Sequence, residues 1–169
     1  EMSNTPEGYP VPKSDTSGGY ILCYCINKPG ALSSYIQQLA EKTGLPLVHL
    51  DRLYWHGDWQ HLSREEFDAA LQRELEKPQW ILDGNFTRTL PHRLQYCDTV
   101  FFFDLPTVTC LWGITKRVLT NYGKTRQDMG GNCEERFDKQ KIELYSHVLT
   151  FNRQHRKTYY ELLSTAENV

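Results

Sequence analysis

Short apolar runs alternate with helical patterns along most of the chain. The runs at residues 20–25, 45–51, 80–83 and 99–104 have the length and composition of buried strands. Between them, and again over residues 134–163, apolar side chains recur at helical spacing. Strands that alternate with helices form a parallel sheet with helices on both faces, so the pattern predicts a three-layer α/β domain.

Local signals mark the ends of the predicted helices. The helix over residues 33–43 is expected to end at Gly44, because glycine readily adopts the backbone conformation that follows a helix. Ser63 and Glu66 have the spacing of a capping box, which predicts a helix that begins there. The final stretch is expected to fold as one or two helices, and its predicted buried stripe consists of Phe137, Leu144, Tyr145, Val148 and Phe151.

Candidate chemistry gathers where the predicted strands end. Ligands of open parallel sheets bind at the carboxyl ends of the strands. In this chain those ends carry the loop of residues 26–34, Asp51, the turn Asp83-Gly84-Asn85 and Asp104. We therefore expect the functional site at this edge of the sheet.

The loop of residues 26–34 lies where a phosphate-binding loop, G-x-x-x-x-G-K-[ST], would lie between a strand and a helix. In that frame Ile26 and Ala31 replace the two glycines and Leu32 replaces the lysine. Only the hydroxyl residue, Ser33, matches the pattern. Leucine cannot neutralise phosphate charge, so a nucleotide site here would be weakened.

A helix N terminus with Gly30, Ser33 and Ser34 remains at this loop, and helix N termini bind anions modestly. Three interpretations stay open for it. The segment is an ordinary strand–turn–helix connection without a nucleotide, a weakened ATP site, or an irregularity of the sequence itself.

Composition narrows the class of protein. Residues 1–19 are polar and rich in Pro, Gly and Ser, which predicts a disordered leader before one domain over residues 20–169. The net charge of −2 gives no general reason to expect nucleic-acid binding, and no apolar run approaches the roughly 20 residues of a membrane span. Five cysteines without a C-x-x-C pattern indicate reduced thiols and a cytoplasmic location.

Several segments together resemble one family, the adenylate-kinase-like P-loop proteins known as DNA topology modulation proteins. They occur in the family's order from about residue 35 to about residue 160. The resemblance implies the kinase version of the P-loop sheet, expected here in the order 2-3-1-4 with the fifth strand missing or incomplete. The matching segments are Leu-Ala-Glu-Lys-Thr-Gly (39–44), His-Leu-Asp (49–51) with Trp55 and Trp59, Ile-Leu-Asp-Gly-Asn-Phe-Thr-Arg-Thr (81–89), Phe-Phe-Asp-Leu-Pro (102–106), Gly-Lys-Thr-Arg-Gln-Asp-Met (123–129) and Cys-Glu-Glu-Arg-Phe-Asp (133–138).

The same resemblance implies roles for charged residues in phosphoryl transfer. Asp51 would orient or deprotonate the acceptor. Arg117 and Arg126 would stabilise the transferring group, and Arg136 would help to bind the nucleotide. The polar insert of residues 121–132 would close over the site as a lid and exclude water.

Further roles concern the acceptor and the metal ion. By resemblance, Arg88, Asn85 and Trp55 would bind the acceptor, while Ser33 and Asp104 would contact Mg²⁺ beside ATP. ATP and Mg²⁺ are thus the cofactors that the family implies.

Ordinary structural explanations stand beside these roles. Asp51 is also typical of a helix cap or a surface acid, and Asp104 of a turn before Pro106. Trp55 is equally typical of core packing, and the insert of a solvated charged loop. Arg93 is expected to be a surface residue that pairs with a neighbouring acid.

The leading hypothesis is a nucleoside- or nucleotide-kinase-like phosphotransferase that uses ATP on a small-molecule acceptor. The alternative is a pseudo-kinase, a binding or regulatory protein that keeps the acceptor site and has lost ATP. Direct action on DNA is not expected from the charge, and neither a membrane nor a nucleic acid is an expected partner.

Overall fold

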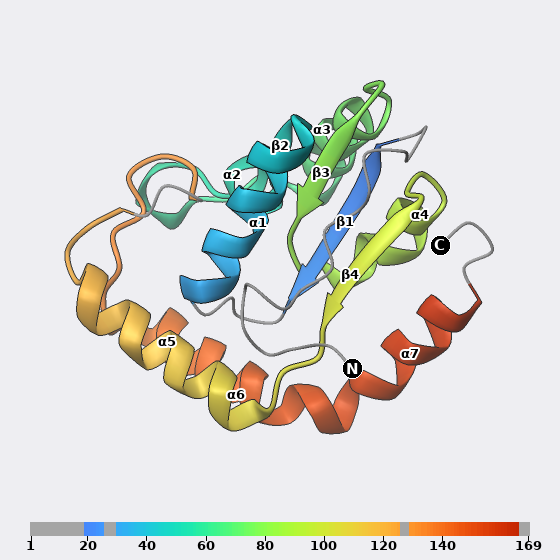
Figure 1. Ribbon diagram of the computed structural model, residues 1–169. Coiled ribbons are helices and arrows are strands. Elements are labelled where there is room, and N and C mark those ends of the chain that lie inside the picture. The colour runs from blue at the N-terminus through green and yellow to red at the C-terminus, as the bar shows by residue number, and fades with distance from the viewer. Residues whose placement is uncertain (1–18, 26–29, 126–128, 166–169) are drawn as a thin grey trace.

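Four parallel strands form the centre of the protein in a computed structural model that describes residues 19–25, 30–125 and 129–165 (Figure 1). The strands are β1 (Tyr20–Cys25), β2 (Leu47–His49), β3 (Trp80–Asp83) and β4 (Thr99–Phe103). They pair in the order β2-β3-β1-β4, and each neighbouring pair is parallel. The predicted α/β class and strand order are confirmed.

Helices connect and cover the strands. Gly44 has a positive φ of 72°, and its N–H donates to the carbonyl of Ala40 at 2.9 Å, so it ends the first helix as predicted. Both hydrogen bonds of the Ser63–Glu66 capping box are present. The helices are α1 (Gly30–Thr43), α2 (Leu50–Tyr54), η2 (Gly57–Trp59), α3 (Arg64–Leu75), η3 (Thr87–Thr89), α4 (Leu90–Leu94), α5 (Thr107–Asn121), α6 (Lys139–Gln154) and α7 (Arg156–Ser164).

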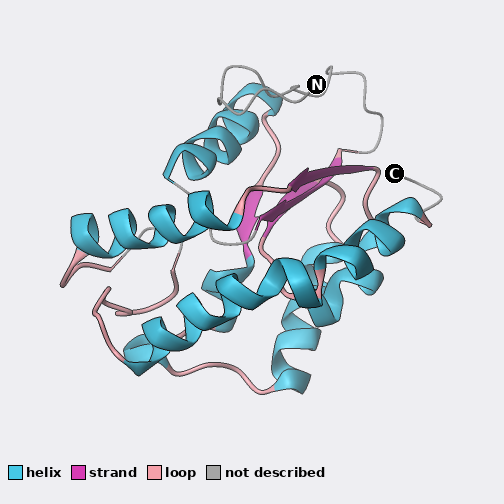
Figure 2. Cartoon of the chain, turned by 90° about the horizontal axis from the view of Figure 1, so that it is seen from below, coloured by secondary structure: helices cyan, strands magenta, loops and turns pink. Residues whose placement is uncertain are grey.

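Each face of the sheet has its own apolar core, because successive strand residues point to opposite faces. On one face Ile21, Cys23 and Ile81 pack against α1. On the other face Leu22 and Leu82 pack against side chains of α3 to α7. Helices consequently lie on both sides of the strands, as Figure 2 shows.

One detail of the last helical stretch differs from the sequence-based expectation. Phe137 is 65% exposed and does not belong to the buried stripe, since α6 begins only at Lys139 and the phenylalanine precedes its periodic pattern. The last helical stretch forms two helices that meet at His155, in agreement with the expectation of one or two pieces.

The remaining expectations concern segments and single residues. The proposed leader lies outside the described residues except for Gly19, whose carbonyl accepts the N–H of Trp80 at 3.0 Å. None of the helices in the described ranges is long and apolar enough to cross a membrane. Four of the cysteines have buried side chains: Cys23, Cys97, Cys110 and Cys133.

Candidate active site at the carboxyl edge of the sheet

A histidine and a buried carboxylate meet where β2 and β3 end. His49 and Asp83 are register partners on these parallel strands. The Nδ1 atom of His49 lies 2.7 Å from Oδ2 of Asp83, whose side chain is 2% exposed. A carboxylate that is almost fully buried needs such a partner to offset its desolvation, so the pair is held firmly.

Asp51 does not end the second strand, because β2 stops at His49. The chain turns directly into α2, and Asp51 lies in the first turn of this short helix, where a carboxylate interacts favourably with the helix dipole. Its backbone carbonyl accepts the N–H of Trp55 at 2.9 Å. The half-buried Asp51 therefore lies two residues after His49, the last residue of β2.

The turn after β3 is clamped by Arg93, which is fully buried rather than a surface pairing residue. Its guanidinium donates from Nη1 to the carbonyl of Gly84 at 3.1 Å and from Nη2 to the carbonyl of Phe86 at 2.7 Å. Planar guanidinium geometry allows one side chain to bind both carbonyls. Asn85 lies between Gly84 and Phe86 in this turn and is half-buried.

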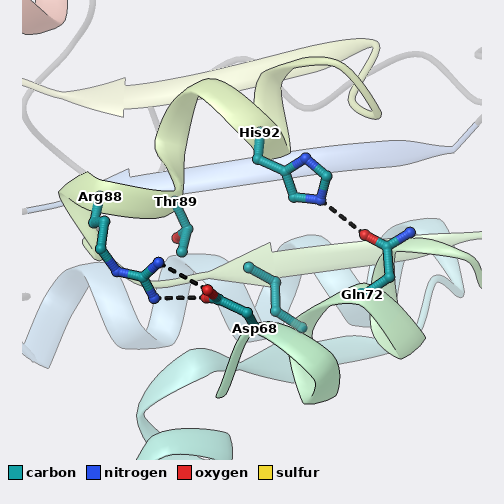
Figure 3. Close-up of a pocket in the computed structure, with 6 residues that line it drawn as sticks. Asp68, Gln72, Arg88, Thr89 and His92 are labelled. Atoms are coloured by element: carbon teal, nitrogen blue, oxygen red, sulfur yellow. Dashed lines mark hydrogen bonds and ion pairs between the residues drawn. The ribbon is translucent and has the colours of Figure 1, made fainter. Parts of the chain in front are cut away.

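Arg88 lies at the rim of a hollow of about 250 Å³ between α3 and α4 (Figure 3). Its guanidinium donates two hydrogen bonds to Asp68, at 2.9 and 2.6 Å. The hydrogen bond from Arg88 lowers the pKa of the Asp68 carboxyl. On the other side of the hollow, Nε2 of His92 lies 2.8 Å from Oε1 of Gln72. A ligand that binds in this hollow would have to replace the contact between Arg88 and Asp68 or the contact between His92 and Gln72.

Trp55 belongs to an aromatic cluster, which agrees with the packing alternative. Its ring contacts Tyr54, Trp59 and His61 at centroid distances of 5.0, 5.5 and 5.7 Å. Trp55 is half-buried, so part of its surface remains open to a ligand. Rings that pack edge to face in this way form a rigid wall after β2.

Residues 129–135, the docking segment, pack against the aromatic cluster and its flanks. A Cβ atom added to Gly130 would lie 1.9 Å from the carbonyl oxygen of Trp55, so only glycine fits this approach. The buried thiol of Cys133 donates to the carbonyl of His56 at 3.0 Å, and Nε1 of Trp59 donates to the carbonyl of Glu134 at 3.2 Å. Met129 and Gly130 of the predicted insert are thus packed, whereas most of its other described residues are exposed.

Arg117 is held at the base of the docking segment. Its Nε lies 3.2 Å from Oε1 of Glu135, while Nζ of Lys141 lies 2.6 Å from Oε2 of the same carboxylate. Lys141 also lies over the ring of Trp59, 4.8 Å from its centroid. The cluster joins α5, the docking segment, η2 and α6 through nearly buried charges.

Arg136, the expected nucleotide contact, does not join this cluster. Arg136 is exposed and donates to Glu134 at 2.7 Å. Arg126 lies outside the described residues. Of the two arginines that the structure describes, Arg117 is the one in a buried charge cluster.

The expected nucleotide loop gives only part of a phosphate site. Leu32 is 3% exposed and packs in the core with Tyr35, Ile36 and other residues of the α1 face, so it cannot offer a charge. Gly30 begins the fourteen-residue helix α1, and Ser33 and Ser34 follow in its first turns, half-buried and exposed respectively. The N terminus of this helix fits an anion, but the lysine of a phosphate-binding loop has no equivalent at position 32.

Asp104 follows β4 and is engaged by α7. Its Oδ2 accepts hydrogen bonds from Arg156 and, at 2.7 Å, from the hydroxyl of Tyr160. A magnesium ion would have to displace this guanidinium, and no group of three or more metal-binding side chains occurs within the described ranges. The residues at this position do not fit the magnesium site that the family implies.

His49, Glu135 and Lys141 were not predicted to have a functional role, and Asp83 was predicted only as part of a turn. The signal for the first pair was present, because adjacent parallel strands that both end in polar residues bring those residues together. Glu135 and Lys141 gave no comparable signal, since charged residues near a glycine-rich insert usually face solvent.

Comparisons with protein-family models, with curated proteins and with solved structures gave no match for this chain.

Proposed function

We propose that the protein is a kinase-like phosphotransferase, which moves a phosphoryl group from ATP to a hydroxyl group of a small nucleoside- or nucleotide-like acceptor. The observation that carries the proposal is the contact between the docking segment and the segment after β2, in a parallel sheet of order β2-β3-β1-β4. Phosphoryl transfer requires a site from which water is excluded, and closure of one segment over another provides it.

The acceptor is assigned to the region between Arg88 and the carboxyl ends of β2 and β3. Arg88 is paired with Asp68 through side chains that are both 48% exposed, and exposed pairs are worth at most about 1 kcal/mol. An anionic or strongly hydrogen-bonding acceptor can therefore take the place of Asp68 at little cost. Asp51 and Trp55 flank the same edge from α2 and its C-cap.

Phosphate groups are assigned to the N terminus of α1 and to Arg117. Ser33 and Ser34 supply hydroxyl groups there, and Glu135 holds the guanidinium of Arg117 in place. Because Leu32 supplies no charge, we expect turnover to be slow compared with enzymes that have the lysine.

The proposal is tested by ATP·Mg²⁺ binding in a calorimeter, with AMP and adenosine as controls, followed by an assay of phosphoryl transfer to a panel of nucleosides. Binding at micromolar concentrations, together with transfer that Asp51→Asn abolishes, would support it. Asp58→Asn is the matched control, since Asp58 is exposed and its φ of 57° is tolerated by asparagine. Absence of transfer to every acceptor would contradict the proposal.

The buried side chain of Leu32 favours a second candidate, a pseudo-kinase that binds the acceptor without ATP. In the same calorimetric series, that protein would bind AMP or adenosine and give no heat with ATP·Mg²⁺. The two functions are therefore separated by one set of titrations.

A further inference from the structure

One nitrogen of His49 is fixed by a buried group, and the other is open. Nδ1 is occupied by Asp83, whereas Nε2 has no hydrogen-bond partner among the residues that the structure describes. The histidine side chain is 21% exposed, so a ligand at the strand ends can reach it. A carboxylate accepts a hydrogen bond, which places the proton on Nδ1 and leaves a lone pair on Nε2.

We propose that His49 is the general base of the phosphoryl transfer described above, and that Asp83 is its positioning residue; the inference rests on that proposed function. Nε2 takes the proton of the acceptor hydroxyl as its oxygen forms a bond to the transferred phosphorus. The bond between that phosphorus and the nucleoside diphosphate breaks, and its electron pair stays on the diphosphate oxygen. The imidazolium, stabilised by the Asp83 carboxylate, later gives its proton to water.

The surroundings of Asp83 suit this positioning role. The carboxylate is 2% exposed, and the turn that follows it is held by the two hydrogen bonds from Arg93. Gly84 permits a close approach, since a Cβ atom added there would lie 2.7 Å from Cβ of Leu50, the residue after His49. Both ends of the pair are thus fixed by tightly packed backbone, as a preorganised base requires.

An imidazole is also better matched to proton transfer near neutral pH than the carboxylate of Asp51. Asp51 lies in the first turn of α2, two residues after His49. In this arrangement Asp51 orients the acceptor, and His49 removes the proton.

The test compares His49→Asn with the wild-type protein. The asparagine amide nitrogen can occupy the place of Nδ1 and still donate to Asp83, so the change removes mainly Nε2. We expect the rate of transfer from labelled ATP to the nucleoside panel to fall by about 100-fold or more, the usual contribution of a general base. Calorimetric affinities for ATP·Mg²⁺ and for the nucleoside are expected to stay unchanged. His147→Asn, on the exposed side of α6, is the control that should keep full activity.

A measurement without turnover gives a second readout. Long-range proton–nitrogen spectra of the wild-type protein are expected to show His49 protonated on Nδ1 and not on Nε2, and Asp83→Asn should shift this balance. A wild-type histidine with its proton mainly on Nε2 would overturn the inference even if His49→Asn failed to fold.

The outcomes separate the two proposals. Transfer that survives His49→Asn but is lost in Asp51→Asn would overturn the role of His49 and leave the phosphotransferase standing. Absence of transfer by the wild-type protein would overturn both.

Discussion

The Nζ atom of Lys141 lies 2.6 Å from Oε2 of Glu135, and the two side chains are 5% and 1% exposed. The second oxygen of this carboxylate faces Nε of Arg117 at 3.2 Å. One buried acid thereby links two cations from α5 and α6 at the end of the docking segment. The arrangement ties the position of that segment to the stability of the helices beneath it.

Glu135→Gln is expected to destabilise the protein strongly. The substitution keeps the shape but leaves Lys141 and Arg117 without the charge that balances them. Loss of one partner from a buried ion pair costs about 3–5 kcal/mol. Urea unfolding monitored by circular dichroism would measure the change.

The adjacent Glu134→Gln is the control for this prediction. Glu134 pairs with the exposed Arg136, so its loss should change the free energy of unfolding by less than about 1 kcal/mol. Equal destabilisation by the two substitutions would show that the buried cluster around Glu135 contributes no more to the free energy of unfolding than the exposed pair does.

Leu32→Lys tests whether the missing charge of the phosphate-binding loop can be restored by one substitution. Because Leu32 is 3% exposed in the core beside α1, an ammonium group at this position would be cut off from water. We expect a loss of at least about 2 kcal/mol, comparable to the cost of cutting a buried leucine to alanine, and no gain in ATP affinity. Chemical unfolding and calorimetry measure the two quantities.

Gln38→Lys provides the comparison, since position 38 is exposed on the same helix. A surface substitution of this kind usually changes stability by less than about 0.5 kcal/mol. Nanomolar ATP binding by Leu32→Lys would contradict the structural explanation of the altered loop.

Sequence patterns were sufficient to predict where the strands and helices lie, because the signals for these elements are local in the chain. Apolar runs located the strands, and Gly44 and Ser63 marked helix ends that the structure contains. The family resemblance supplied the strand order that the structure confirms. Where a signal extended over only one or two residues, as at the end of β2, the prediction failed and Asp51 was placed on the wrong element.

The candidate site was harder to predict because its contacts join distant segments. The burial of Arg93 depends on two carbonyl groups of a turn seven and nine residues away, and charged residues are rarely buried. The packing of Gly130 against Trp55 depends on the backbone of both segments. Neither relationship leaves a periodic pattern in the chain.

Gly130→Ala is expected to loosen the docking segment. Its new methyl group would meet the carbonyl oxygen of Trp55 at 1.9 Å, and backbone at this distance must move. Overpacking of this kind typically costs about 1–3 kcal/mol. The thiol of Cys133, buried against His56, should then react faster with a thiol reagent.

Gly57→Ala, on the opposing segment, is the matched control for this experiment. A Cβ atom there meets nothing within 4 Å, so the reactivity of Cys133 should stay at the wild-type rate. If Gly130→Ala also left the thiol protected, the close approach of the two segments would be refuted.

Arg93→Lys is expected to destabilise the protein although it conserves the charge. The guanidinium reaches the carbonyls of Gly84 and Phe86 with two different nitrogens, and a lysine ammonium cannot reproduce that fork. Hydrogen bonds to charged groups contribute about 1.5–3 kcal/mol each, so the loss of one should lower the free energy of unfolding by a similar amount.

Arg73→Lys, on the exposed side of α3, should be nearly neutral in the same urea titration. Because the clamped turn follows Asp83, the lysine variant should also broaden the His49 ring resonances; unchanged spectra and stability would remove Arg93 from the support of the site.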